Sequence, residues 1–177
     1  MPECILFVDG ENLLHKIKEV NSKIDLSTVD LNGLLSQVFS KHQVPRKIFY
    51  ASKLRFHPDF KKKSQELIKF QRKLRNNLVA QGYEFTIAGN VRAQKLGSST
   101  VFREKGVDVK IAVDMVSLAC DKKLDVALLC SSDSDLQPAI TEMKNRGVKV
   151  VYIGFENNPN KGLIYTTDET ILLKATP

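Results

Sequence analysis

Residues 5–14 read ILFVDGENLL, an apolar run that ends on an aspartate and is followed at once by glycine, glutamate and asparagine. The run ILFV has the length and composition of a buried strand, whereas the residues after it repeat their apolar positions at helical spacing. A strand suited to the interior of a protein therefore carries Asp9 at its carboxyl end, next to the first turn of a helix. The question is what a carboxylate does there.

Strand-like and helix-like segments alternate along the chain. The pattern predicts strands at 5–8, 47–51, 83–88, 126–130 and 149–153, and helices at 11–20, 31–41, 58–81, 107–122 and 135–146. Segments 89–106 and 155–162 are interpreted as loops, although STVF at 99–102 would suit a strand. This alternation is typical of a three-layer α/β/α sandwich, in which helices cover both faces of a mostly parallel, Rossmann-like sheet.

Length and composition favour one domain in the cytoplasm. The 177 residues suit a single domain over 1–177, and no apolar run approaches the roughly 20 residues of a membrane span, so we expect no membrane association. The chain begins with an apolar strand instead of a basic leader, which predicts a cytoplasmic location. Cys4, Cys120 and Cys130 lie in apolar segments, where we expect them as buried hydrophobic residues.

The net charge of +7 is concentrated in one segment. Residues 53–75 contain nine Lys and Arg against two Asp and Glu, whereas the rest of the chain holds 18 of each kind. This basic face is either a solvated helix surface or a contact region for phosphates, and the concentration of all the excess charge favours nucleic acid. The candidate residues are Lys53, Arg55, Lys61, Lys62, Lys63, Lys69, Arg72 and Lys73, with Arg92, Lys95, Arg103 and Lys105 from the following loop.

Acidic residues gather where predicted strands end and helices begin. Asp9 closes the first strand, Asp133 and Asp135 follow the fourth, and Asp108 opens the helix of GVDVKIAVDM. If the strand order is 3-2-1-4-5, which we assume, the strands that end at Asp9 and Asp133 are neighbours at the ligand-binding edge. Each aspartate alone suits a helix N-cap. Together, carboxylates about 4 Å apart repel by roughly 4 kcal/mol per pair at an effective dielectric of 20, which a divalent cation would offset.

Oxygen donors of this kind favour Mg²⁺ or Mn²⁺, and the lack of a His and Cys cluster disfavours zinc. Asn12 either orients Asp9 or serves only the first helical turn, and Ser131 offers a hydroxyl near the same edge. Asp114 follows Asp108 by six residues, about 240° around a helix, so it either reaches the site from another angle or pairs with a neighbouring base. The patterns GxGxxG, GxxxxGK[ST] and GxSxG do not occur in the sequence.

Three spaced motifs, FVDGENL at 7–13, EKGVDVKIAVDM at 104–115 and LLCSSDSDLQPAI at 128–140, resemble the LabA-like branch of the NYN domain family, within the PIN-like nuclease group. The resemblance spans about residues 5–153 and implies a PIN-like fold with metal-dependent cleavage of RNA by clustered aspartates. Ser132 departs from it, because the usual pattern SGDSDF has glycine there. Nucleases of this group often add a further acid from the middle of the chain, to which no residue is assigned here.

Carried onto this sequence, the resemblance implies Asp9, Asp108 and Asp133 as metal ligands and catalytic residues, with Asp135 and Asn12 in supporting roles. Asp114 and Ser131 remain candidates without an assigned role. The residues and the resemblance together predict a metal-dependent nuclease, expected to be an endoribonuclease that cleaves single-stranded RNA with Mg²⁺ or Mn²⁺. RNA is the expected partner, DNA is the alternative nucleic acid, and a homodimer is one of the oligomeric states open to the chain.

Two other functions stay open at this point. The first is a module that binds RNA or a partner protein without cutting, which the serine at position 132 favours. The second is a phosphatase or nucleotide hydrolase that uses the same acids on a small phosphate ester. The length of the basic segment argues against the second function, and a salt-sensitive affinity for oligonucleotides would separate the two kinds of substrate.

Overall fold

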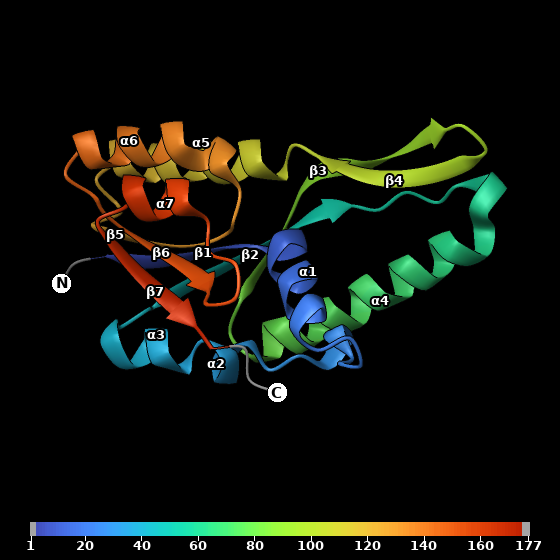
Figure 1. The fold of residues 1–177 in the computed structure, drawn as a ribbon, viewed down its shortest axis with the longest axis horizontal. Coiled ribbons are helices and arrows are strands. Elements are labelled where there is room, and N and C mark those ends of the chain that lie inside the picture. The colour runs from blue at the N-terminus through green and yellow to red at the C-terminus, as the bar shows by residue number, and fades with distance from the viewer. Residues whose placement is uncertain (1–2, 175–177) are drawn as a thin grey trace.

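The computed structural model describes residues 3–174, in which seven strands form one sheet with helices on both faces (Figure 1). The strand order is β4-β3-β2-β1-β5-β6-β7, and neighbouring strands are parallel except for the antiparallel pair β3 and β4. The predicted mostly parallel α/β architecture is confirmed. The order assumed for the five predicted strands is also confirmed, because they correspond to β3-β2-β1-β5-β6 in the sheet. The strands are β1 (Cys4–Asp9), β2 (Arg46–Lys53), β3 (Glu84–Leu96), β4 (Ser99–Lys105), β5 (Val126–Cys130), β6 (Lys149–Phe155) and β7 (Glu169–Leu173).

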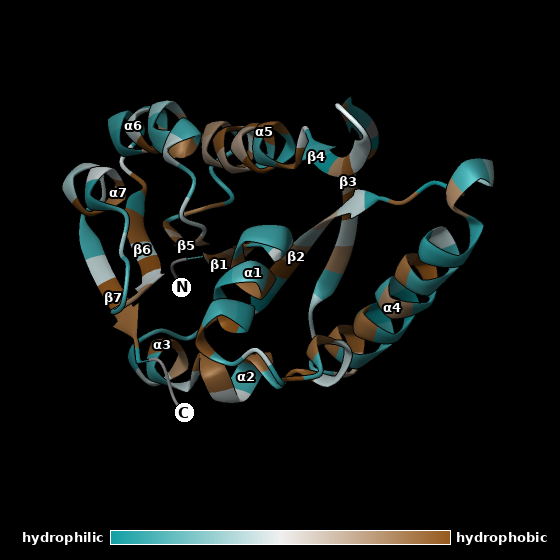
Figure 2. Ribbon diagram, turned by 45° about the vertical axis from the view of Figure 1, so that its right-hand side comes forward, coloured by the Kyte–Doolittle hydropathy of each residue, from teal (hydrophilic) through white to brown (hydrophobic). Residues whose placement is uncertain are grey.

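The helices form two layers, one on each face of the sheet (Figure 1). Along β1, Leu6 and Val8 face one layer while Ile5 and Phe7 face the other, and all four side chains are fully buried. Both faces are covered, which explains why residues 4–8 of β1 and Val126–Cys130 of β5 are continuous apolar runs. One layer holds α1 (Gly10–Val20), α2 (Leu31–Leu34), α3 (Ser36–Lys41) and α4 (Lys61–Ala80); the other holds α5 (Val107–Cys120), α6 (Gln137–Asn145) and α7 (Lys161–Thr166). In Figure 2 the helices mix teal and brown, and α5 is largely brown.

The segment 89–106 forms a β-hairpin, so the prediction of a loop there was wrong. Strand β3 continues to Leu96, the chain turns at Gly97 with a φ of +62°, and β4 returns alongside β3. Only glycine adopts such a φ freely. Exposed and half-buried side chains alternate along β4, but its sequence STVFREK does not alternate apolar and polar residues, so the pattern by which a half-buried strand is recognised is missing.

Two smaller predictions also need correction. The helix expected at 31–41 is divided into α2 and α3 at Leu35, whose ψ of 12° interrupts the helical backbone. Cys4 and Cys130 are buried as predicted, but Cys120 is exposed because it ends α5 at the surface, where the Arg146 side chain donates a hydrogen bond to its sulfur. Across residues 3–174, none of the helices has both the length and the apolar character needed to cross a membrane.

Candidate metal centre

The parallel pairing of β1 with β5 places the first and third motifs side by side. Val8 lies opposite Cys130, so the next residues lie side by side: Asp9, which ends β1, and Ser131, which follows β5. The Ser131 hydroxyl donates a hydrogen bond to Asp9 Oδ2 at 3.0 Å, and the backbone N–H of Asn12 donates to Asp9 Oδ1 at 3.2 Å. Asp9 is therefore the N-cap of α1 and is also tied to the neighbouring strand, with only 8% of its surface exposed.

Gly10 explains how α1 can begin directly at the sheet. A Cβ atom at this position would lie 2.4 Å from the Phe49 ring and 2.4 Å from the carbonyl oxygen of Tyr50, both on β2. Any side chain would therefore push the first turn of α1 away from β2, and Asp9 with it. The glycine after Asp9 is required by close packing.

Two asparagines hold the turn between β5 and α6. Asn12 Oδ1 accepts a hydrogen bond from the Ser132 N–H at 2.9 Å, and Asn160 Nδ2 donates to the Ser132 carbonyl oxygen at 2.8 Å. Within residues 3–174, Lys122 is the one non-glycine residue with a positive φ, so Ser132 occupies an ordinary backbone conformation. The turn therefore accepts serine in the glycine position without backbone strain.

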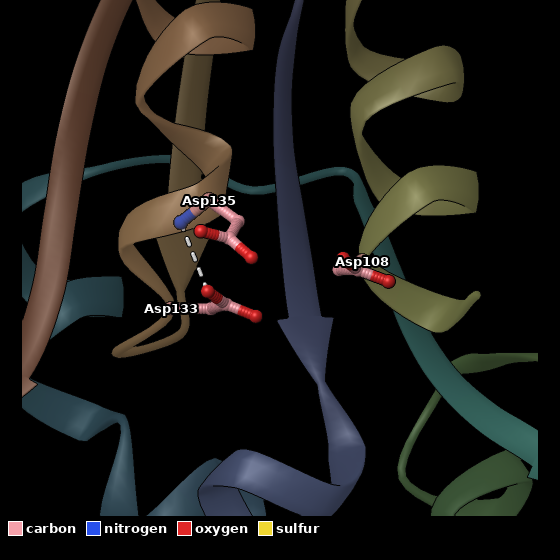
Figure 3. Close-up of side chains that lie close together, drawn as sticks. All are labelled: Asp108, Asp133 and Asp135. Carbon is pink, nitrogen blue, oxygen red and sulfur yellow. Dashed lines mark hydrogen bonds between the residues drawn. The ribbon is translucent and has the colours of Figure 1, made fainter. Parts of the chain in front are cut away.

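This turn and the start of α5 bring three carboxylates together (Figure 3). Asp108, Asp133 and Asp135 each offer one oxygen, and these three oxygens lie within 4.8 Å of one another. Asp133 and Asp135 come from the turn after β5, where the Asp135 N–H donates to Asp133 Oδ1 at 2.9 Å, while Asp108 lies in the first turn of α5. Carboxylate oxygens are the donors that hard divalent cations prefer, so this set fits Mg²⁺ or Mn²⁺.

Glutamates extend the negative charge beyond these aspartates. Asp9, Asp133, Glu11 and Glu104 line one cavity of about 280 Å³. The Glu104 carboxylate accepts a hydrogen bond from the Val107 N–H at 2.8 Å, which holds it at the start of α5. We call the six acids around this edge of the sheet the acidic edge; they are Asp9, Glu11, Glu104, Asp108, Asp133 and Asp135.

Burial and neighbouring charges raise the pKa values of two acids of this edge, Asp9 and Glu104. The pKa of Asp9 is raised to about 6, first by burial and to a smaller extent by the charges of Glu104 and Asp133, while its two hydrogen bonds act in the opposite direction. The pKa of Glu104 is also raised, first by burial and then by the charges of Glu11, Asp108 and Asp133. The edge therefore carries negative charge that is poorly balanced by the protein itself, as expected for a cation site.

Asp114 lies apart from the acidic edge. The Tyr50 hydroxyl donates to Asp114 Oδ2 at 3.0 Å, and the Lys110 ammonium group pairs with Asp114 Oδ1. Of the two alternatives for Asp114, the structure shows the second, an ion pair with a neighbouring basic residue, Lys110. Asp9 does not belong to the three-acid cluster but lies on the adjoining wall, and its role as a metal ligand stays a prediction.

Sequence reasoning missed three residues of this region. Glu104 stands at the start of the second motif and lines one cavity with Asp9 and Asp133, so the motif itself held the signal. Glu11 was part of the first motif but was counted as a helix residue. Asn160 had no signal, because its contact with Ser132 joins segments 28 residues apart.

The predicted nucleic-acid-binding residues are all exposed and lie on α4, on the end of β2 and the segment after it, and on the β3–β4 hairpin. We call this set the basic arm; it comprises Lys53, Arg55, Lys61, Lys62, Lys63, Lys69, Arg72, Lys73, Arg92, Lys95, Arg103 and Lys105. Aromatic contacts join its parts: Phe60 and His57, before α4, pack edge to face on Phe102 of β4, and the Lys63 ammonium group lies 4.8 Å from the centre of the same ring. The start of α4 therefore touches the hairpin.

Comparisons with known proteins agree with this architecture. The model of the NYN domain family matches residues 4–174. A crystal structure of a protein of unknown function from Vibrio parahaemolyticus has a TM-score of 0.67 and 22% identity, over 97% of this chain and 92% of that one, which shows a shared fold. The D15 flap endonuclease of bacteriophage T5, crystallised with DNA and metal ions, has a TM-score of 0.49 and 17% identity over 85% of this chain and 55% of that chain.

Among curated proteins, an uncharacterized protein of Methanocaldococcus jannaschii is 42% identical over 50 residues. This match covers 28% of the present chain and 21% of that protein, so it spans about a fifth of the relative's length.

Proposed function

The chain belongs to the NYN domain family, and from that premise we propose that it is a metal-dependent endonuclease that hydrolyses single-stranded RNA. Its three sequence motifs place it, in this proposal, in the LabA-like branch. The observation that carries the proposal is the cluster of Asp108, Asp133 and Asp135 at the carboxyl edge of the parallel sheet, where α/β proteins bind their ligands. The cluster lies beside a cavity with further acids, and one of these, Glu104, comes from the hairpin that carries part of the basic arm.

Asp108, Asp133 and Asp135 would hold a Mg²⁺ or Mn²⁺ ion, with Asp9 on the adjoining wall. When bound, such an ion stabilises charge that develops on a phosphodiester and makes water a better nucleophile. The hydrogen bonds from Ser131 and Asn12 fix both oxygens of Asp9.

The basic arm supports a polyanionic substrate. Arg92 of β3 lies directly opposite Arg103 of β4, so two positive side chains share one face of the hairpin. Like charges in that arrangement destabilise a sheet, and phosphate groups between them would remove the repulsion. A small phosphate ester would leave most of the basic arm unused, which favours a nucleic acid over the phosphatase alternative.

The alternative function is an RNA-binding module without catalysis. Its main support from the sequence was Ser132 in a glycine position. The relaxed backbone at Ser132 and the presence of Glu104 beside the cluster both weaken that support.

Cleavage of a labelled single-stranded RNA and the matching DNA, each with Mg²⁺, Mn²⁺ or EDTA, tests the proposal. We expect the RNA to be cut at internal positions with either metal and to stay intact in EDTA. If the RNA binds in a salt-sensitive way but is never cut, the result would contradict the nuclease and favour the non-catalytic RNA-binding module. Equal cutting of DNA would widen the substrate to both nucleic acids.

A further inference from the structure

A second cavity, of about 400 Å³, opens beside the acidic edge. Its walls come mainly from α1, the end of β2, α4 and the β3–β4 hairpin. Figure 1 shows these elements at the centre and right of the view, with α1 and α4 below the hairpin. Most of the lining is apolar, and it includes Leu14, Leu67 and the rings of Phe49, Phe70 and Phe102. The volume lies within the range of roughly 300 to 1,000 Å³ that is typical of ligand sites.

The two cavities meet at shared walls. Glu11, His15 and Glu104 line both the apolar cavity and the acidic one. A ligand with its phosphate at the acids would therefore have its neighbouring groups at the mouth of the apolar cavity. The apolar cavity is not needed to bind a cation or to hold the acids. Its position beside them therefore indicates a site for a part of the substrate that has apolar faces.

Besides Glu11 and Glu104 on the shared wall, cations lie at the apolar cavity and narrow the chemical class of that group. Lys18 lies in its wall, and Phe102, which also lines it, carries the Lys63 ammonium group over its ring. A fully apolar ligand would gain nothing from these cations. A nucleobase has flat faces that stack on aromatic rings, polar edges that can meet Gln71 and Ser52 in the wall, and an attached phosphate that pairs with the cations.

We propose that the apolar cavity receives one unpaired base of the RNA strand, from the nucleotide adjoining the phosphate at the acidic edge. This inference rests on the proposed function and deepens it, because it explains selectivity for single strands. A paired base would have to leave its stack before it could enter, at the cost of its stacking and pairing. The cavity then selects strands in which the base is already free.

Abasic scanning tests the inference. One nucleotide without a base is moved along a labelled single-stranded RNA, and the wild-type protein is given each strand with Mg²⁺. Cutting should fall about tenfold or more at the phosphate next to the abasic position and stay unchanged elsewhere, since the stacking of one base supports roughly a 5-fold to 150-fold gain. Uniform cutting along every strand would overturn the inference and leave the nuclease standing. No cutting of any strand would overturn the proposed function and the inference with it.

A matched pair of variants on α4 provides a readout without cleavage. Leu67→Trp places an indole ring in the cavity where the base would lie, whereas Val79→Trp adds the same side chain at an exposed position about 18 Å farther along the helix axis. In EDTA, wild type and Val79→Trp should bind a short uridine strand about tenfold more tightly than an abasic strand of equal length and charge. Leu67→Trp should bind both strands alike. If a folded Leu67→Trp protein still bound the uridine strand more tightly than the abasic strand, the base would bind outside this cavity and the inference would be overturned.

Discussion

The acidic edge and the basic arm carry opposite charges and are built in opposite ways. Asp9 is almost fully buried, and the turn beside it is held at Ser132 by asparagines from α1 and from the segment before α7. The residues of the basic arm are exposed, and their charges project into solvent. The acidic edge therefore depends on the placement of single atoms, whereas the basic arm depends on summed charge. Each of the following predictions tests one side of that contrast.

The largest effect is expected for a carboxylate of the cluster. Asp133→Asn should weaken Mn²⁺ binding by at least about 100-fold, more than the loss seen when only a residue supporting a metal ligand is changed. Asp114→Asn is the matched control, because Asp114 is paired with Lys110 and Tyr50 away from the cluster. Titration with Mn²⁺ followed by electron paramagnetic resonance measures both. Equal binding by the two variants would mean that the cluster does not hold the metal.

The next effect is on stability, through the raised pKa of Asp9. Below about pH 4 the carboxyl group is protonated in the folded and the unfolded protein, and it carries no penalty. From about pH 4 to 6 only the folded protein keeps the proton, so stability falls as pH rises. Above pH 6 the penalty is complete, at roughly 3 kcal/mol for a difference of about two pKa units.

Asp9→Asn should therefore raise the melting temperature of the metal-free protein at pH 7.5 and leave it near the wild-type value at pH 4. Asparagine is never charged, and its Oδ1 can still accept the hydrogen bond from the Asn12 N–H that caps α1, while its Nδ2 would donate toward the Ser131 hydroxyl instead of accepting from it. Thermal unfolding in EDTA at the two pH values measures the difference. A variant that is less stable than wild type at pH 7.5 would show that the charged form of Asp9 stabilises the fold.

A smaller loss is expected when the turn is disturbed without any change to the cluster. Asn160→Asp keeps the oxygen that caps α7 but removes the N–H donor to the Ser132 carbonyl. Cleavage should fall about 10-fold to 100-fold, because supporting residues of metal sites have effects of this size. Asn160→Ala loses the cap as well, so it should be less stable than Asn160→Asp. Full activity of Asn160→Asp would mean that Asn12 alone positions the turn.

The smallest effect is expected in the basic arm. Replacing Lys61 and Lys62 with Gln should weaken RNA binding modestly and lower the slope of log affinity against log salt by about 1.4, at roughly 0.7 per phosphate contact. The matched control is the same change at Lys41 and Lys123, which lie before β2 and β5 at the opposite edge of the sheet. Fluorescence anisotropy across a salt series measures both slopes. Equal slopes would remove these lysines from the RNA contact surface.

The sheet and the acidic residues could be predicted because their signals are local. Buried strands such as 5–8 and 126–130 are short apolar runs, and Asp9 and Asp133 follow them directly. Strand order at the centre of a doubly wound sheet then brings the two ends together. The hairpin formed by the second half of β3 and by β4 escaped prediction because its sequence does not alternate apolar and polar residues, although exposed and half-buried side chains alternate along β4.

The details of the site required the structure because they depend on distant segments. Nothing near Asn160 in the sequence indicates that it contacts Ser132. Helical spacing separated Asp114 from Asp108, but only the structure assigns it to Lys110 and Tyr50. The apolar cavity likewise combines residues from segments far apart in the sequence, and its apolar residues each suit an ordinary core position when read alone.

The most direct test of the nuclease account is single-turnover cleavage of single-stranded RNA by two variants of the same helix, Asp108→Asn and Asp114→Asn, with Mg²⁺. Both changes remove one carboxylate from α5, but only Asp108 lies in the cluster. The account predicts that Asp108→Asn abolishes cutting while Asp114→Asn cuts at about the wild-type rate. Cutting by a folded Asp108→Asn protein at the wild-type rate would contradict it.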